Sequence, residues 1–116
     1  MVTLYGIKTC DTCRTARAWL KDAGIEHHWV DLRDDGVDSA RLVAWRDALG
    51  DAALLNKRSK TWREFDADQR AAAEADPIAV LLEHPTLAKR PILETATDIL
   101  AGFSDARYQA ALAGAD

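Results

Sequence analysis

The sequence has no long hydrophobic run. None of its apolar stretches approaches the roughly 20 residues that a membrane-spanning helix requires, and its first residues lack the basic-then-apolar pattern of a secretory signal. We therefore expect no membrane contact and a cytoplasmic location. The sequence also lacks an excess of basic residues, and its net charge of −4 argues against a direct nucleic-acid surface.

Several enzyme motifs are absent as well. The sequence shows no Ser-His-Asp arrangement, no phosphate-binding loop and no pair of carboxylates placed for acid–base work. It contains no internal repeat, no low-complexity tract and no interdomain linker. A chain of 116 residues fits one domain with one modest core, so we expect a single domain over residues 1–116.

Cysteine is scarce, but its placement is informative. The only two cysteines, Cys10 and Cys13, form a C-x-x-C pair. A β-prone run, Val2–Tyr5, precedes them, and apolar residues at helical spacing follow. The pair therefore lies where a strand leads into a helix, and the positive end of a helix favours a thiolate over a thiol. This placement indicates a redox or nucleophilic centre.

The helical spacing assigns different roles to the two thiols. Cys13 shares a helical face with Ala16 and Leu20 and is expected to face the core, which would make it the shielded, resolving thiol. Cys10 lies at the helix end and is expected to be the exposed, attacking thiol. Nearby basic residues would further favour a Cys10 thiolate: Lys8, Arg14 and Arg17. Asp11 would oppose them slightly.

Two other interpretations of the cysteine pair stay open. A zinc site would need two further ligands, and His27 and His28 are the candidates. Adjacent histidines on a strand point to opposite faces, however, and no second C-x-x-C exists. The pair could also be two unreactive cysteines at a helix terminus. Cytosolic redox chemistry remains the preferred interpretation.

The rest of the sequence predicts a β-α-β unit, a helical block and a final β-β-α unit. The expected elements are a strand over 28–32, a loop over 34–36, helices over 39–49, 66–75 and 77–83, strands over 91–94 and 99–101, and a last helix after Ser104. The segment 56–60 is polar and basic, without a clear period. A β-α-β unit is normally a right-handed parallel unit.

The motifs together resemble the ArsC family. The matching segments are 2–8 before Cys10, 54–58, 61–63, 89–92 and 102–104. This thioredoxin-like family holds glutaredoxin-coupled arsenate reductases, the Spx regulators and the YffB proteins, of which the YffB branch is the most similar. The resemblance implies an α/β fold: a thioredoxin-like four-stranded mixed sheet with a helical insertion, about 37–86, between strands 2 and 3.

The resemblance also implies roles for individual residues. Cys10 would be the catalytic nucleophile, Arg90 would bind an oxyanion or thiolate beside it, and Pro91 would be a cis-proline close to the active sulfur. Thr9 and Thr12, on either side of Cys10, would donate hydrogen bonds to a thiolate or cap the helix. The expected site residues are Cys10, Cys13 and Arg90 for catalysis and Lys8, Thr9, Thr12, Asn56, Arg58 and Pro91 for substrate binding.

The sequence departs from the arsenate reductases in its arginines. Those enzymes present three arginines to the oxyanion, and only Arg90 has a clear counterpart here. Asn56 occupies the position of the second arginine, with Arg58 as a possible substitute, and Gly102 occupies the position of the third arginine. Because fewer guanidinium groups bind an oxyanion more weakly, a thiol or mixed-disulfide substrate fits better than arsenate.

We therefore expect a glutathione- or glutaredoxin-dependent thiol reductase. Glutathione would be a co-substrate, and neither a tightly bound cofactor nor a metal is expected. Two alternatives stay open. The chain could be an Spx-type redox-responsive regulator that binds RNA polymerase, because it shares the C-x-x-C pair, or it could be a genuine arsenate reductase.

Overall fold

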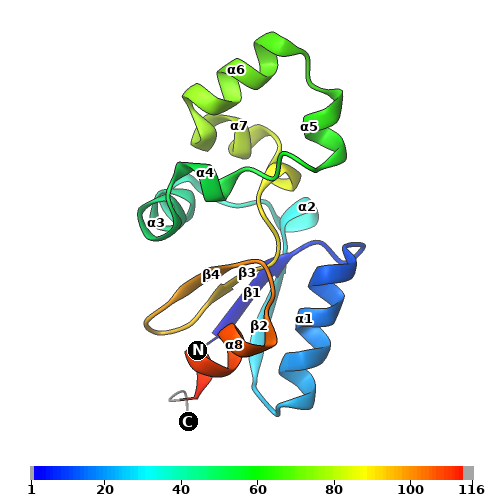
Figure 1. Ribbon diagram of the computed structural model, residues 1–116, viewed down its shortest axis with the longest axis vertical. Helices are drawn as coiled ribbons and strands as arrows, with labels where there is room; N and C mark the ends of the chain where they lie inside the picture. The colour runs from blue at the N-terminus through cyan, green and yellow to red at the C-terminus, as the bar shows by residue number, and fades with distance from the viewer. Residues whose placement is uncertain (1, 114–116) are drawn as a thin grey trace. The chain divides into compact units, whose positions relative to one another are not determined.

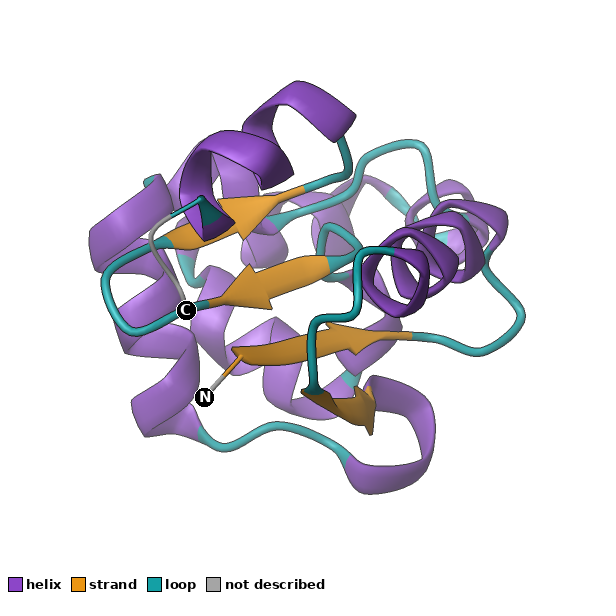
Figure 2. Ribbon diagram, turned by 90° about the horizontal axis from the view of Figure 1, so that it is seen from below, coloured by secondary structure: helices purple, strands orange, loops and turns teal. Residues whose placement is uncertain are grey.

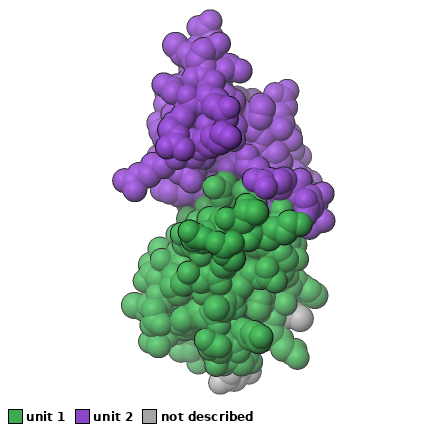
Figure 3. Space-filling model, turned by 90° about the vertical axis from the view of Figure 1, so that its right-hand side faces the viewer, with its two compact units in different colours: residues 1–31, 90–116 green, residues 32–89 purple. Residues whose placement is uncertain are grey.

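The computed structural model describes residues 2–113, which group into two compact units (Figure 3). Unit 1 combines Met1–Asp31 with Arg90–Asp116, and unit 2 is the continuous segment Leu32–Lys89 between them. The predicted insertion, about 37–86, falls within unit 2. The expectation of a single domain over 1–116 stays a prediction.

Unit 1 is a four-stranded mixed sheet with two helices (Figures 1 and 2). Its elements are β1 (Val2–Gly6), α1 (Asp11–Asp22), β2 (His27–Asp31), β3 (Ile92–Glu94), β4 (Ile99–Ala101) and α8 (Asp105–Leu112). The strand order is β2-β1-β3-β4, in which β1 runs parallel to β2 and antiparallel to β3. This order makes β2 and β4 the two edge strands and brings the segment after Arg90 beside the first strand.

One apolar cluster joins the two helices to the sheet. Its buried members are Val2, Leu4, Ala16, Leu20, Leu93, Tyr108 and Leu112. Alternation along β1 explains the contribution of the sheet, and the i, i+4 spacing of Ala16 and Leu20 explains that of α1. Trp19 contacts Tyr108 edge to face, with ring centroids 5.6 Å apart. The cluster therefore fixes α1, and the residues at its start, against the sheet.

Unit 2 is helical. Its elements are α2 (Leu32–Asp35), α3 (Ser39–Leu49), α4 (Asp51–Leu54), α5 (Lys60–Glu64), α6 (Ala67–Ala75), α7 (Pro77–Glu83) and a 3-10 turn (Pro85–Leu87). Side-chain oxygens of Asp38, Ser59, Asp66 and Asp76 accept backbone N–H groups at the starts of α3, α5, α6 and α7. At the end of the unit, the Lys89 N–H donates to the Leu54 carbonyl at 2.9 Å.

The structure differs from the predicted elements mainly in short helices. The strand predicted over 28–32 is β2, which ends at Asp31. The segment 34–36, predicted as a loop, begins with the end of the one-turn helix α2, and Gly36 follows with φ 70°. The helices α4 and α5 were also not predicted. A helix of four or five residues is too short to show a hydrophobic period, so the sequence pattern could not reveal these turns.

The longer elements were predicted within one or two residues. The first helix, α3, α6, α7, both hairpin strands and the last helix all lie where periodicity, caps and glycines placed them. Within residues 2–113, no helix combines the length and apolar character that crossing a membrane requires.

Candidate active site

Cys10 is the first residue of the site because it lies at the N-terminus of α1. It is the N-cap residue, with extended backbone (φ −87°, ψ 124°), and its carbonyl accepts the Arg14 N–H at 3.0 Å. The Cys10 side chain makes no capping hydrogen bond, and a capping role of Thr9 or Thr12 stays a prediction. The partial positive charge of the helix end therefore acts on Cys10.

A buried carboxylate holds the turn before Cys10. Asp31, only 5% exposed, ends β2 and accepts the Lys8 N–H at 3.0 Å. The Cys10 N–H then donates to the Ile7 carbonyl at 3.0 Å, which closes the turn. The carboxyl ends of the parallel strands β1 and β2 thus come together beside the thiol. The sequence interpretation did not identify Asp31 as part of the site, although its position at the end of a predicted parallel strand was a usable signal.

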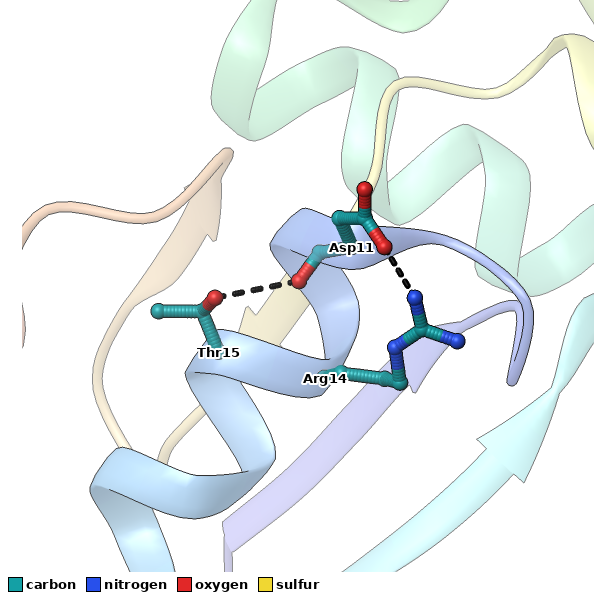
Figure 4. Close-up of polar contacts among 3 residues, drawn as sticks. All are labelled: Asp11, Arg14 and Thr15. Carbon is teal, nitrogen blue, oxygen red and sulfur yellow. Dashed lines mark hydrogen bonds and ion pairs between the residues drawn. The ribbon is translucent and has the colours of Figure 1, made fainter.

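The basic residues near Cys10 mostly have other partners. Arg14 forms an ion pair with Asp11, and the Thr15 hydroxyl donates to the Asp11 carbonyl at 3.1 Å (Figure 4). The Arg17 guanidinium lies 4.3 Å from the ring centre of Trp29. Neither arginine is among the groups that shift the pKa of Cys10. The prediction that Arg14 and Arg17 promote the thiolate therefore finds no support in this geometry.

The pKa of Cys10 is lowered. Partial burial, the largest single effect, acts to raise it, but hydrogen bonds from the Cys13 backbone N–H and the Cys13 thiol oppose burial. A hydrogen bond from Arg90 and the positive charge of Arg90 add to the stabilisation of the thiolate. Together these interactions outweigh burial, so Cys10 has the acid–base character of a nucleophile.

The pKa of Cys13 moves in the opposite direction. Burial raises it to about 12, and the neighbouring Cys10 adds to the shift. The Cys13 side chain is fully buried, as its helical position predicted. It fits there because residue 6 is a glycine: a Cβ at Gly6 would lie 2.5 Å from the Cys13 Sγ. Gly6 is a second site residue whose role in burying Cys13 the sequence interpretation missed.

Arg90 and Pro91 reach the site from the second segment of unit 1. The Arg90–Pro91 peptide bond is cis, as the family resemblance implied. Pro91 is buried, and its carbonyl accepts the Gly102 N–H at 2.8 Å. The start of β3 and the end of β4 thereby hold the Arg90 backbone, and Arg90 is the one expected catalytic arginine that the structure brings to Cys10.

Two expected substrate-binding residues belong to unit 2. The Asn56 side-chain oxygen accepts the Arg58 N–H at 3.1 Å, and the Asn56 N–H donates to the Leu87 carbonyl at 2.8 Å. The first bond closes a turn at residues 56–58, and the second connects this turn to Leu87 near the end of unit 2. The substrate-binding roles of Asn56 and Arg58, like those of Lys8, Thr9 and Thr12, stay predictions.

The candidate zinc ligands of the sequence do not gather into a site. Across residues 2–113, no group of three or more His, Cys, Asp or Glu side chains is arranged to hold a metal ion. The Nδ1 of His27 instead lies 3.0 Å from the Ile25 carbonyl, and both cysteines are free thiols. The arrangement can thus perform chemistry through sulfur: a stabilised Cys10 sulfur, a buried proton donor in Cys13 and a cation in Arg90.

Comparison with known proteins gives consistent matches over nearly the whole chain. The model of the ArsC family matches residues 5–111. An uncharacterized protein of Haemophilus influenzae is 44% identical over 114 residues, which cover 97% of this chain and 100% of that protein. The global transcriptional regulator Spx of Streptococcus pyogenes is 30% identical over 97% of this chain and 85% of the regulator.

A solved structure matches equally well. The YFFB (PA3664) protein superposes with a TM-score of 0.90 at 37% identity and covers 97% of this chain and 99% of its own. This match confirms the predicted thioredoxin-like α/β fold.

Proposed function

Because this chain belongs to the ArsC family, we propose that it is a thiol–disulfide oxidoreductase that uses Cys10 as its nucleophile and glutathione or glutaredoxin as its reductant. The observation that carries the proposal is the opposed acid–base character of the two thiols. Cys10 has a lowered pKa beside Arg90, whereas the neighbouring Cys13 keeps its proton. Two unreactive cysteines would not require a lowered pKa at one of the two thiols.

The proposed reaction has two exchange steps. The Cys10 thiolate attacks one sulfur of a substrate disulfide, forms a mixed disulfide with it and releases the other sulfur as a thiolate. A glutathione thiolate then attacks the mixed disulfide and restores the Cys10 thiolate. When the substrate is a glutathionylated protein, the protein thiol is released first, and the second step yields oxidised glutathione. Each step exchanges one S–S bond for another.

The structure favours glutathione over Cys13 as the resolving thiol. Resolution by Cys13 requires its thiolate, and burial holds the pKa of Cys13 at about 12. As a thiol, Cys13 instead donates a hydrogen bond to the Cys10 sulfur, which favours the Cys10 thiolate as nucleophile and as leaving group. Arg90 would stabilise negative charge that develops at the substrate sulfur.

A pair of single variants tests the proposal. Cys10→Ser should abolish the glutathione-dependent reduction of a glutathionylated peptide, followed by chromatography, because serine is not an effective nucleophile toward sulfur. Cys13→Ser should keep a substantial part of the rate, since a hydroxyl can still donate a hydrogen bond to Cys10. Unchanged turnover by Cys10→Ser would refute the proposal, and loss of activity in both Cys10→Ser and Cys13→Ser would exclude the one-thiol route.

A second candidate function is regulation of transcription of the Spx type. It is supported by the 30% identity to the regulator Spx over nearly the whole chain and by the C-x-x-C pair. In that case, oxidation of Cys10 and Cys13 would change binding to RNA polymerase. A pull-down with the α subunit of RNA polymerase, performed with reduced and oxidised protein, tests this function, and the absence of redox-sensitive binding would exclude it.

Arsenate reduction is the weaker alternative. Gly102 stands at a position where arsenate reductases are expected to carry an arginine, and its φ of 77° is a conformation that favours glycine. We therefore expect no arsenate reduction above background in a glutathione-coupled assay. A clear rate that depends on Cys10 would identify the chain as an arsenate reductase instead.

A further inference from the structure

A basic groove lies along α1. Its volume is about 820 Å³, and it is lined by Arg14, Arg17, Ala18, Lys21, Gly24, Ile25, Glu26 and His27. All of these residues belong to unit 1. The proposed chemistry at Cys10 uses none of them, so the groove is a separate feature of the surface.

The cations of the groove form one stripe. Arg14, Arg17 and Lys21 recur at i, i+3 and i+7 on α1, which places them on one helical face. Glu26 is the one acidic residue among the eight that line the groove, whereas the whole chain has a net charge of −4. The groove is thus positively charged on a chain that is negative as a whole, which indicates an anionic ligand.

The stripe begins at the catalytic end of α1. Arg14 is one turn from Cys10 and binds Asp11, the residue next to Cys10 (Figure 4). Arg17 packs over Trp29 and is held in place by this contact, at 4.3 Å from the ring centre. A peptide whose disulfide Cys10 attacks could therefore continue directly along the stripe.

The opposite wall of the groove leads into an edge strand. Residues 24–27 connect to β2, and the sheet of the described residues has no strand beyond β2. The edge of a sheet is the common docking place for an extended peptide, whose alternate side chains point to one side. An extended ligand fits this wall better than a compact one.

We propose that this groove binds an acidic, extended segment of the protein whose disulfide Cys10 reduces. The inference rests on the proposed oxidoreductase function and adds the substrate class: proteins with carboxylates beside the reactive cysteine. Charge complementarity to Arg14, Arg17 and Lys21 selects such a segment. The adjoining edge strand β2 favours a peptide over a nucleic acid, because its backbone groups can pair with those of an extended polypeptide.

A binding experiment tests the groove without any thiol chemistry. The probe is a fluorescein-labelled eight-residue peptide with glutamate at alternate positions and no cysteine, followed by fluorescence anisotropy in 20 mM salt. The native chain should bind it, and Arg17→Glu/Lys21→Glu should bind it at least tenfold more weakly. The same double variant should gain affinity for the matching lysine peptide, an inversion that misfolding cannot produce.

The matched control changes the net charge equally outside the groove. Arg41→Glu/Arg46→Glu on α3 should leave the preference for the glutamate peptide unchanged. Equal binding of both peptides by the native chain, or equal effects of the two double variants, would overturn the proposal. Tighter binding of an eight-nucleotide RNA than of the glutamate peptide would also overturn it, in favour of a nucleic-acid site.

A rate experiment then connects the groove to Cys10. The substrates are glutathione mixed disulfides of cysteine alone, of a glutamate-flanked peptide and of a lysine-flanked peptide. We expect the glutamate peptide to react about tenfold faster than the lysine peptide in 20 mM salt, with a smaller difference in 0.5 M salt. Reduction of the cysteine compound without discrimination between the peptides would overturn the inference alone, whereas no reduction of any substrate would refute the proposed function itself.

Discussion

At the scale of single residues, Cys10 and Cys13 show how neighbouring thiols can acquire opposite properties. Arg90 and two hydrogen bonds from Cys13 lower the pKa of Cys10 despite its burial, and burial raises that of Cys13 to about 12. The sequence predicted that Cys13 is buried, because helical periodicity reports the face of α1, whereas Cys10, expected to be exposed, is half-buried. The family resemblance pointed to Arg90, but proximity in the sequence also pointed to Arg14 and Arg17. The sequence could not exclude those two, since Asp11 and Trp29 are partners that only the fold reveals.

Removal of the Arg90 charge should weaken the Cys10 thiolate. We expect Arg90→Gln to slow alkylation of Cys10 by iodoacetamide at pH 7 by on the order of tenfold, because loss of an adjacent cation raises the pKa of a thiol. The pH dependence of the alkylation rate, measured in a Cys13→Ser background, reports the change. Arg107→Gln is the control, since Arg107 donates to the Ala101 carbonyl instead. Equal rates for all three proteins would contradict the role of Arg90.

Cys13 should make the protein less stable at alkaline pH. Its pKa is about 12 in the folded state and ~8.5 in an unfolded chain, so its contribution to stability is complete below pH ~8.5 and is lost as the pH rises to about 12. We expect the free energy of unfolding to fall by up to about 1.4 kcal/mol per pH unit over this range. Urea titrations at pH 8 to 11 measure the slope.

The variant Cys13→Ala isolates this effect. It should be less stable than the native chain at pH 8, because a buried group is lost, but its slope against pH should be shallower. Burial also raises the pKa of Tyr108, which accounts for a remaining slope above pH 10. Parallel slopes for the two proteins would show that Cys13 ionises normally.

At the scale of elements, the site depends on how closely β1 approaches α1. Gly6, the last residue of β1, leaves the space that the Cys13 sulfur occupies. Composition and periodicity predicted the strand that Gly6 ends and the helix that follows it. The contact itself joins residues on two different elements, so only the folded arrangement reveals why residue 6 has no side chain.

We expect Gly6→Ala to destabilise the protein by about 1–3 kcal/mol, because the new Cβ would overlap the Cys13 sulfur. Displacement of Cys13 should also weaken its hydrogen bond to Cys10 and slow alkylation of Cys10. Gly24→Ala provides the comparison: its φ of 72° makes the substitution strained, but no neighbour lies within 4 Å of the added Cβ. Both variants should be less stable, and only Gly6→Ala should react more slowly. The same alkylation rate in both would contradict the proposed contact.

At the scale of the whole molecule, the chain consists of a sheet unit made from two separate segments and a helical unit made from one. The family resemblance predicted this organisation, because the helical insertion is a property of the family. Periodicity alone gave only the order of the elements. It could not show that β3 pairs with β1, since strand pairing over such a separation depends on tertiary packing.

If the chain is one domain, its two units should unfold together. Trp19 and Trp29 report on unit 1, and Trp45 and Trp62 report on unit 2. In urea, we expect the fluorescence midpoint of Trp45→Phe/Trp62→Phe to coincide with the far-ultraviolet dichroism midpoint of the same protein. The reciprocal variant, Trp19→Phe/Trp29→Phe, should behave likewise. Two separate midpoints within one protein would show that the units are independent domains.

The division of unit 1 into two segments has a consequence for the protein during its synthesis. Cys10 is translated before Arg90, which follows only after the whole of Leu32–Lys89. Until β3 pairs with β1, the new chain lacks the cation that lowers the pKa of its thiol. The nascent polypeptide therefore carries a Cys10 thiol without its Arg90 partner, and the sulfur gains this part of its stabilisation only after Leu32–Lys89 and β3 have been synthesised.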